Sequence, residues 1–532
     1  MIRGPHCSSM PPKLELNLFP DFQLLTPAGC VRDWTWEDKR HAFDEHGDVF
    51  LVVSPQGIIC YCADAAMAFD VMNRRYDFTK PRDKYKMLEP YGPNVVTAEG
   101  STYRFHVRMV APSFGDNTGV NELVWQETSR QTKLLMDIWM KIAPKNLDTD
   151  INALTLAIIS LAGFGKRLES VQEQSQDIPA GYEISFLSAL RNTARNILPI
   201  LLFPLWLMDI TSYADASLAK RQLDKYLRAL IQRERAKEVD DEADLMSRAN
   251  LLHTVVHAIE GEESKDQAAK GSKEKKRAFT EDEVMGNLFI YMLAGYDTTA
   301  NSIQYGLLML AANPDVQSKV IAEIDQVYDE AAVEGRHVLT YNEDFAKLEY
   351  TFGYMYETFR LYPGVLLITK VCNEEQTIQL QDGETHETRD VVLPAGCRVY
   401  LSSPGVHYNR RYWEDAYELK PERWLTDKFS HQGEGELDQS GKHVVAADKT
   451  RQMRGTLLTF SDGARACLGR KFAQAEFMAF FATLLRHFRV TFADGVDLRQ
   501  IKSNLEKKSA GKVVSLTPLS GFPLELKQRT PA

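Results

Sequence analysis

Runs of apolar residues along the chain predict a mainly helical protein with a small β-rich part. Near the start, residues 49–53 and 57–61 are two β-type runs joined by a Ser-Pro-Gln-Gly turn, which predicts a β-hairpin. A second β signal covers residues 391–393 and 398–401, split by the Pro-Ala-Gly of residues 394–396. Between these two regions the pattern is mostly that of helices.

The most informative predicted helix begins at Thr280, which has the capping-box spacing to Glu283, and ends before Asn313 and Pro314. Its roughly thirty residues correspond to about 45–50 Å of helix. Between residues 284 and 313 the only charged residue is Asp297. Such a helix is either buried at the centre of a protein or spans a membrane, and the polar residues around Asp297 favour the buried position.

Composition narrows the class of protein. The chain has 532 residues, of which 44% are apolar, enough for a large core. Its net charge of −10 argues against a nucleic-acid partner and against a general binder of anionic membranes. The seven cysteines are scattered and form no C-x-x-C pair, which argues against a secreted disulfide framework and against a structural zinc site. We therefore expect a reducing, intracellular compartment.

The ends and the polar stretches predict how the chain is organised. Residues 1–30 contain no apolar run long enough for a membrane span, so we expect a segment without a transmembrane helix, then one domain over residues 31–525 and a tail over 526–532. Polar stretches at residues 261–277 and 430–449 are predicted to be surface loops.

The most apolar stretch runs from Ile197 to Met208, is broken by two prolines and is predicted to be a loop. It is too short to span a bilayer. It either dips into a membrane surface or packs on its own protein, and the sequence leaves both alternatives open.

The strongest chemical signal is the sequence FSDGARACLG, which ends two residues after Cys467. An isolated buried cysteine is usually an inert apolar side chain. In this frame, however, Cys467 is predicted to bind a haem iron as a thiolate, the ligand that favours O–O cleavage. Gly463 permits a tight turn, and Gly469 lets the next helix begin close to the macrocycle. The guanidinium of Arg465 is suited to bind a haem propionate through two hydrogen bonds, and the ring of Phe460 is suited to shield the sulfur from water.

A second signal lies at the midpoint of the long helix, in the sequence AGYDTT that begins at Ala294. A buried carboxylate such as Asp297 is costly unless it is paired or functional, and Thr298 carries a hydroxyl that donates and accepts. Alone, the two residues fit a threonine bonded to a helix carbonyl and an aspartate paired with a basic side chain. Together with Cys467, they fit proton delivery to bound dioxygen.

A third signal is the sequence ETFR, in which Glu357 and Arg360 lie three residues apart on one helical face. Such a pair is usually a solvated surface salt bridge. A proline closely follows this pair, and Arg423 in the later sequence PERW supplies a second arginine. We therefore expect Glu357, Arg360 and Arg423 to form a buried structural network that fixes the loop before Cys467.

With these motifs in place, the chain resembles the cytochrome P-450 superfamily of haem-thiolate monooxygenases over most of residues 30–525. In its overall sequence it resembles members from filamentous fungi that act in secondary metabolism. The resemblance implies a mainly α fold: a single triangular domain with a long central helix and a small β-rich region. It makes Cys467 the axial ligand of the haem iron, Asp297 and Thr298 the proton-delivery residues, and Arg465 a propionate contact. It rests on four motifs in the family's order: AGYDTT (294–299), ETFR (357–360), PERW (421–424) and FSDGARACLG (460–469).

The chain departs from the family pattern near the haem propionates. Tyr103 and Val107 stand where the family usually has a tryptophan and an arginine on an early helix, so Tyr103, His106 and Arg108 become the candidates for that contact. Lys370 stands where an arginine is common. Fungal relatives usually carry an N-terminal anchor helix, and residues 1–30 do not.

The resemblance also implies an activity: one oxygen atom of O2 is inserted into a hydrophobic small molecule, with electrons from NADPH through a separate cytochrome P-450 reductase. Six basic residues and one acidic residue between Lys449 and Lys471 suggest a surface for that reductase. The alternatives are a family member that reduces nitric oxide or rearranges peroxides, and a haem-binding sensor without turnover. We expect a monomer in the cytosol or attached to the cytosolic face of the endoplasmic reticulum. The apolar residues expected to line the substrate pocket are Leu293, Ala294, Val365, Leu366 and Phe522.

Overall fold

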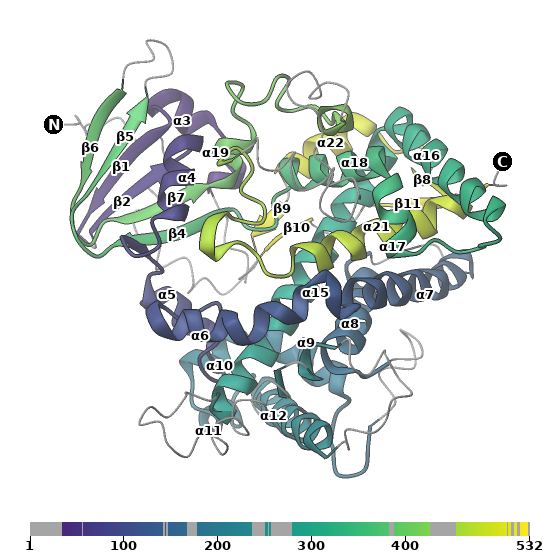
Figure 1. The fold of residues 1–532 in the computed structure, drawn as a ribbon, viewed down its shortest axis with the longest axis horizontal. Helices are drawn as coiled ribbons and strands as arrows, with labels where there is room; N and C mark the ends of the chain where they lie inside the picture. The colour runs from purple at the N-terminus through teal and green to yellow at the C-terminus, as the bar shows by residue number, and fades with distance from the viewer. Residues whose placement is uncertain are drawn as a thin grey trace.

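The computed structural model describes residues 34–55, 57–141, 144, 147–167, 178–236, 250–253, 255–256, 279–381, 388–425, 454–507, 509–511, 515–518 and 522–529. The predicted N-terminal segment and the two predicted surface loops at residues 261–277 and 430–449 lie outside these residues. The described part is mainly helical with small sheets, as predicted (Figure 1). Its helices are α2 (Trp34–Asp38), α3 (His41–His46), α4 (Ala65–Asn73), α5 (Arg82–Tyr85), α6 (Gly100–Val110), α7 (Val120–Lys141), α8 (Leu147–Phe164), α9 (Phe186–Arg195), α10 (Ile197–Leu202), α11 (Leu205–Met208), α12 (Ala214–Arg235), α15 (Glu281–Ala312), α16 (Pro314–Val333), α17 (Tyr341–Asp344), α18 (Glu349–Leu361), α19 (Ser403–His407), α21 (Arg470–His487) and α22 (Leu498–Lys507).

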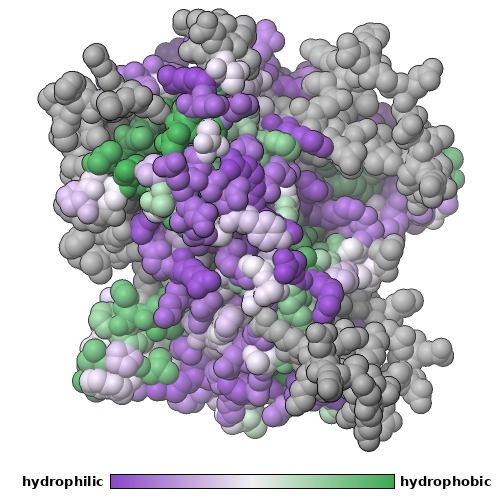
Figure 2. Space-filling model, turned by 60° about the vertical axis from the view of Figure 1, so that its left-hand side comes forward, coloured by the Kyte–Doolittle hydropathy of each residue, from purple (hydrophilic) through white to green (hydrophobic). Residues whose placement is uncertain are grey.

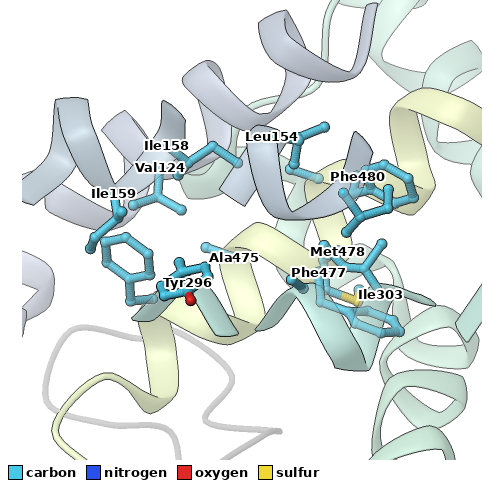
Figure 3. Packing of buried hydrophobic residues seen from close by; sticks show 14 of the residues in the cluster. Val124, Leu154, Ile158, Ile159, Tyr296, Ile303, Ala475, Phe477, Met478 and Phe480 are labelled. Carbon is cyan, nitrogen blue, oxygen red and sulfur yellow. The ribbon is translucent and has the colours of Figure 1, made fainter. Parts of the chain in front are cut away.

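The long helix α15 forms the centre of the molecule, as predicted. Thr280 and Glu283 make both bonds of the capping box, and the helix ends at Ala312, directly before Asn313 and Pro314. Apolar side chains of three helices lie together in the core (Figure 3): Leu154, Ile158 and Ile159 of α8, Tyr296 and Ile303 of α15, and Ala475, Phe477, Met478 and Phe480 of α21. By length and composition α8 is apolar enough to cross a membrane, but 78% of it is buried inside the protein.

The β-rich part lies on one side of the molecule, at the left of Figure 1. Its main sheet has the order β1-β2-β7-β4-β3, in which β2 and β7 are parallel and the other neighbours antiparallel. The predicted hairpin is confirmed as β1 and β2. The strands are β1 (Val49–Ser54), β2 (Gly57–Cys62), β3 (Phe78–Thr79), β4 (Leu367–Cys372), β5 (Gln376–Gln381), β6 (Thr388–Leu393), β7 (Arg398–Ser402), β8 (Phe488–Phe492), β9 (Ser509–Gly511), β10 (Leu516–Pro518) and β11 (Leu524–Gln528).

Three sequence predictions need correction or refinement. The second β signal is present as β6 and β7, but the two strands join different sheets, since β6 pairs with β5. The boundary predicted at residue 525 falls inside β11, which pairs with β8. The predicted loop from Ile197 to Met208 contains the two short helices α10 and α11. Its prolines are tolerated because Pro199 lies in the first turn of α10 and Pro204 directly precedes α11, where no backbone N–H is needed.

Candidate functional site

Cys467 lies in a tight loop between the short 3₁₀ helix Gly463–Arg465 and α21. Its backbone N–H donates to the Phe460 carbonyl over 2.8 Å, and the Asp462 carboxylate accepts from the N–H of Gly463 over 2.7 Å. Gly463 has a φ of +65°, and a Cβ at this position would come within 2.8 Å of Asn73 Oδ1. The tight turn predicted at Gly463 is therefore present, and it lets the loop pack against the end of α4.

The Cys467 side chain is exposed to solvent, yet enough protein surrounds it that burial raises the pKa of its thiol. Both observations fit a sulfur that faces an internal space walled by the protein. Two nearby features oppose the effect of burial: the backbone N–H of Gly469 donates to the sulfur, and Arg470 supplies positive charge. Both stabilise the thiolate, which is the form of cysteine that binds metals.

The central helix α15 leaves one face uncovered in its middle. Of its residues from 283 to 312, all but Ala294, Gly295, Thr298 and Ser302 are buried. Ala294, Thr298 and Ser302 are spaced by four residues and therefore lie along one face of the helix. A flat cofactor needs such a strip of small side chains, which lets it approach the helix backbone.

The uncovered face of α15 and the Cys467 loop approach the same region of the fold. Phe114 connects them: its ring centre is 5.5 Å from that of Tyr291, one turn before the uncovered face, and a Cβ on Gly469 would meet the Phe114 ring at 4.0 Å. On the other side, a Cβ on Gly364 would lie 3.9 Å from Thr298. The two predicted halves of the site therefore lie close together.

Asp297 and Thr298 make different contacts. The Thr298 hydroxyl donates to the Ala294 carbonyl over 2.7 Å, the back-bonded geometry that a mid-helix threonine often adopts. The buried Asp297 carboxylate accepts a short hydrogen bond from the Ser515 hydroxyl, which itself accepts from the Asn301 amide over 2.7 Å. Ser515 was not predictable, because it precedes a short strand that carries no motif.

The predicted structural network is present and buried. Glu357 and Arg360 are both 0% exposed, and the guanidinium donates to both carboxylate oxygens over 2.7 and 2.8 Å. Arg423 lies 3.5 Å from the same carboxylate, and Trp424 donates to it over 3.2 Å. A buried bidentate pair of this kind is far more costly to break than a surface salt bridge.

The connection from this network to the cysteine loop runs through His407, which the motifs did not indicate. Its Nδ1 lies 3.0 Å from the Arg360 carbonyl, and its Nε2 accepts from the backbone N–H of Leu458 over 2.8 Å, two residues before Phe460. A carbonyl only accepts and an amide N–H only donates, so the proton of the neutral ring must lie on Nδ1. Burial and the charge of Arg360 lower the pKa of His407 to about 3, so the ring is neutral at ordinary pH.

Among the early-helix candidates, Tyr103 is the residue that contacts the cysteine loop. Its hydroxyl donates to the Ala464 carbonyl, and the Arg465 guanidinium stacks 3.3 Å above the centre of its ring. Arg465 also donates to the Ala98 carbonyl over 2.8 Å and pairs with Glu99 over 2.6 Å. One position of its fork, Nη1, is buried and has no hydrogen-bond partner among the described residues.

This arrangement fits the carboxylate edge of the implied haem. Lys370 is 2% exposed, and burial together with the charge of Arg465 lowers its pKa to about 8. Two buried cations therefore lie beside the loop that carries the predicted iron ligand, and one of them has an N–H without a partner in the described ranges. Propionate oxygens are suitable acceptors for both.

The contacts of the other two early-helix candidates point away from a propionate. His106 is 0% exposed and lies 3.2 Å from the Glu283 carboxylate and 3.1 Å from the Asn287 amide of α15, so both its ring nitrogens are engaged. Arg108 lies on the exposed outer face of α6, with its guanidinium 5.6 Å from the Phe105 ring. The helical spacing that puts Tyr103 beside the loop turns these two side chains to other faces.

The predicted substrate-pocket residues differ in exposure. Leu293 and Leu366 are buried in the core, at 4% and 7% exposure. Ala294 is exposed, and Val365 and Phe522 are partly buried. The open members of the set are therefore Ala294, Val365 and Phe522.

The chain is similar to known proteins over most of its length. The family model described as cytochrome P450 matches residues 28–516. A cytochrome P450 monooxygenase, ORF6, of Penicillium roqueforti is 49% identical over 508 residues, which cover 94% of this chain and 85% of the relative. The monooxygenase of the phomenoic acid biosynthesis cluster of Leptosphaeria maculans is 23% identical, covering 88% of this chain and 80% of the relative. Among solved structures, the haem domain of cytochrome P450DA superposes with a TM-score of 0.67 at 17% identity, covering 92% of each chain.

Proposed function

The chain belongs to the cytochrome P450 family and is a cytochrome P450 monooxygenase, and on this basis we propose that it oxygenates a hydrophobic intermediate of fungal secondary metabolism. One oxygen atom of O2 enters the substrate, and NADPH supplies electrons through a separate reductase. The observation that carries the proposal is the approach of the Cys467 loop to the one uncovered face of α15.

The residues have distinct tasks in this proposal. Haem bound through a cysteine thiolate supplies an electron-rich iron that favours O–O cleavage. Cys467 would hold the iron, and Arg465, Tyr103 and Lys370 would hold the carboxylate edge. The bond from the Gly469 N–H opposes the effect of burial on the pKa of the thiol and so favours the thiolate form.

Proton delivery is assigned to the uncovered face of α15. Because the Thr298 hydroxyl donates to the Ala294 carbonyl, its oxygen lone pairs are left to accept a hydrogen bond from a ligand or water on that face. The Asp297 carboxylate is held by Ser515, so it remains beside Thr298 as a buried acid–base group.

Simultaneous measurement of O2 and NADPH consumption tests the activity. Enzyme reconstituted with haem, an NADPH-dependent P450 reductase and a substrate should consume about one O2 and one NADPH per oxygenated product. Candidate substrates are found first by screening apolar metabolites for ligand-induced shifts in the haem spin-state spectrum. Reduction of nitric oxide by NADH without reductase or O2 would instead favour the alternative chemistry and overturn the proposal.

The substrate class rests on two supports. The partly open pocket residues Ala294, Val365 and Phe522 are all apolar, which favours a hydrophobic ligand. Secondary metabolism is supported by the fungal relatives, one of which is named for a biosynthetic cluster.

The reductase surface is proposed on the side of the cysteine loop. Of the six basic residues predicted there, Lys449 and Arg451 lie outside the described residues, and Arg465 pairs with Glu99 in the interior. Arg454, Arg470 and Lys471 are exposed, and Lys471 pairs with the equally exposed Asp116.

The outer face of α6 extends this basic surface. Arg104 and Arg108 are exposed there, and Arg104 shares the hydroxyl of Tyr76 with Arg75. An acidic reductase would be steered by such a surface, more strongly at low salt. Changing both Arg454 and Arg470 to glutamine should therefore raise the KM for reductase and flatten its salt dependence.

An exposed pair on another helix provides the control for that test. Arg233→Gln with Arg235→Gln, at the end of α12, removes the same charge and should leave both readouts unchanged. If the two double variants behave alike, the proposed docking surface is wrong.

A peripheral membrane contact is proposed through α10 and α11. Leu202 is 58% exposed, Phe203 40%, Trp206 67% and the following Ile210 76%, whereas Ile197 and Met208 are buried. Figure 2 shows hydrophobic residues gathered in separate patches on a largely hydrophilic face, and the lower patch lies at the height of α10 and α11 in Figure 1. Such a contact would attach the protein to the cytosolic face of the endoplasmic reticulum. The monomeric state of the protein remains a prediction.

A further inference from the structure

Four charged side chains from separate parts of the chain converge beside the Cys467 loop. Lys80 follows β3, Glu99 precedes α6, Lys370 lies in β4 and Arg465 ends the 3₁₀ helix before the cysteine. The Glu99 carboxylate accepts from the backbone N–H of Lys80 over 3.2 Å and pairs with Arg465 over 2.6 Å. Lys80 therefore belongs to the same cluster as the residues predicted for the propionates, although no motif marks it.

The cluster carries more positive charge than it balances internally. When Lys80, Lys370 and Arg465 are all protonated, they surround the single carboxylate of Glu99 and leave a surplus of two positive charges. Burial, then the charge of Arg465, lowers the pKa of Lys80 to about 7 and that of Lys370 to about 8, despite the opposing effect of Glu99. Uncompensated buried charge is costly, so a partner with two negative charges would stabilise the site.

The donors of the cluster are also only partly used. Within the described part of the chain, Lys80 Nζ gives one hydrogen bond, to the Val96 carbonyl over 2.5 Å, out of the three that an ammonium can donate. Arg465 Nη1 is buried without a partner among the described residues. An aromatic wall lies beside these donors, since Lys80 Nζ is 4.9 Å from the ring centre of Tyr85.

We propose that Lys80 is a cofactor-binding residue: Lys80 and Lys370 together bind one haem propionate, Arg465 binds the other through Nη1, and Glu99 holds Arg465 in place. This inference rests on the proposed function, which supplies the haem. The two propionates carry two negative charges, which equals the surplus in the cluster. Two lysines then take over the task that an arginine or a tryptophan usually performs in the family.

Haem and its dimethyl ester separate a propionate contact from a structural one, because the ester has the same ring without the two charges. The holoenzyme is reconstituted with each group, and the rate of transfer to excess apomyoglobin is measured for the wild type and for Lys80→Met. Loss of a charged hydrogen bond should speed haem release about 10- to 100-fold. With the ester, the wild type and Lys80→Met should release at equal rates, and Lys80→Arg should retain haem better than Lys80→Met.

Lys84→Met is the matched control. Lys84 lies four residues further on, in α5, and its ammonium bonds the Tyr400 hydroxyl, so haem release should stay at the wild-type rate. Equal acceleration of haem and ester release by Lys80→Met would overturn the inference, and so would no acceleration at all. If Lys80→Met does not fold, equal release of haem and ester from the wild type would still overturn it. A wild-type protein without the thiolate spectrum would instead refute the proposed function itself.

Discussion

Replacing His407 should release the cysteine loop from the Glu357–Arg360 network. In His407→Phe the ring volume is nearly kept, but the Arg360 carbonyl loses its donor and the Leu458 N–H loses its acceptor. Each buried backbone group left unsatisfied costs about 1–3 kcal/mol, so the variant should lose about 2–6 kcal/mol of unfolding free energy. Equilibrium urea unfolding of the reconstituted holoenzyme measures this loss.

A second readout separates loop positioning from general destabilisation. If His407 positions the loop, His407→Phe should lose much of the red-shifted band that a thiolate-bound haem gives in its reduced carbon-monoxide complex. His106→Phe is the matched control, because His106 is also 0% exposed and also engages both ring nitrogens, but with Glu283 and Asn287 instead of the loop. It should lose stability and keep the band.

The pH dependence gives an independent check on His407. Its pKa of about 3 in the folded protein lies below the ordinary histidine value of 6.5, so the unfolded chain takes up the proton first. The stabilising effect is therefore present above pH 6.5 and is lost as the pH falls from there towards 3. His407→Phe should show a smaller loss over this window. An unchanged thiolate band and an unchanged pH dependence in this variant would refute the role assigned to His407.

Three further predictions concern other parts of the molecule. Both carboxylate oxygens of buried Glu476 lack a hydrogen-bond partner among the described residues, and burial raises its pKa well above 4.5. Stability should therefore fall as the pH rises above that value, and Glu476→Gln should unfold at higher urea concentration than the wild type at pH 8 but not at pH 4. Asp297→Asn and Thr298→Ala should each lower the product formed per NADPH and raise hydrogen peroxide release at least severalfold, and unchanged coupling in both would contradict their assignment. Trp206→Glu should weaken sedimentation with lipid vesicles about tenfold, whereas Val333→Glu, at an apolar residue that is 91% exposed on α16, should not; equal binding by both variants would contradict the membrane contact.

Local signals in the sequence were sufficient to predict those features of the structure that are formed by residues close together in the chain. The capping box of Thr280 and Glu283 and the hairpin of β1 and β2 are formed by residues a few positions apart, and both are present as predicted. The ETFR pair was predictable for the same reason, since i and i+3 positions on a helix are adjacent.

Contacts between distant segments were not predictable in the same way. His407 and Leu458 are 51 residues apart, and Asp297 and Ser515 are 218 apart, so neither pair leaves a pattern in the sequence. The partners of β6 and β7 depend likewise on which strands the fold brings alongside them.

The early helix α6 shows where resemblance alone falls short. Three candidates were predicted for one propionate contact, and only the rotation of the helix distinguishes them. It brings Tyr103 to Arg465, directs His106 into the core and leaves Arg108 outside. Lys80 was missed because it lies on a connection that no motif marks, and it is linked to the site through its bond to Glu99 and the nearby charge of Arg465.

The reduced carbon-monoxide difference spectrum tests haem-thiolate ligation by Cys467 most directly. The wild-type protein expressed with haem should show the red-shifted thiolate band, and Cys467→Ser should lose that band while Cys397→Ser, at a buried cysteine beside β7, should keep it. A wild-type spectrum without the band, or an intact band in Cys467→Ser, would contradict the assignment of Cys467 as the ligand of the haem iron.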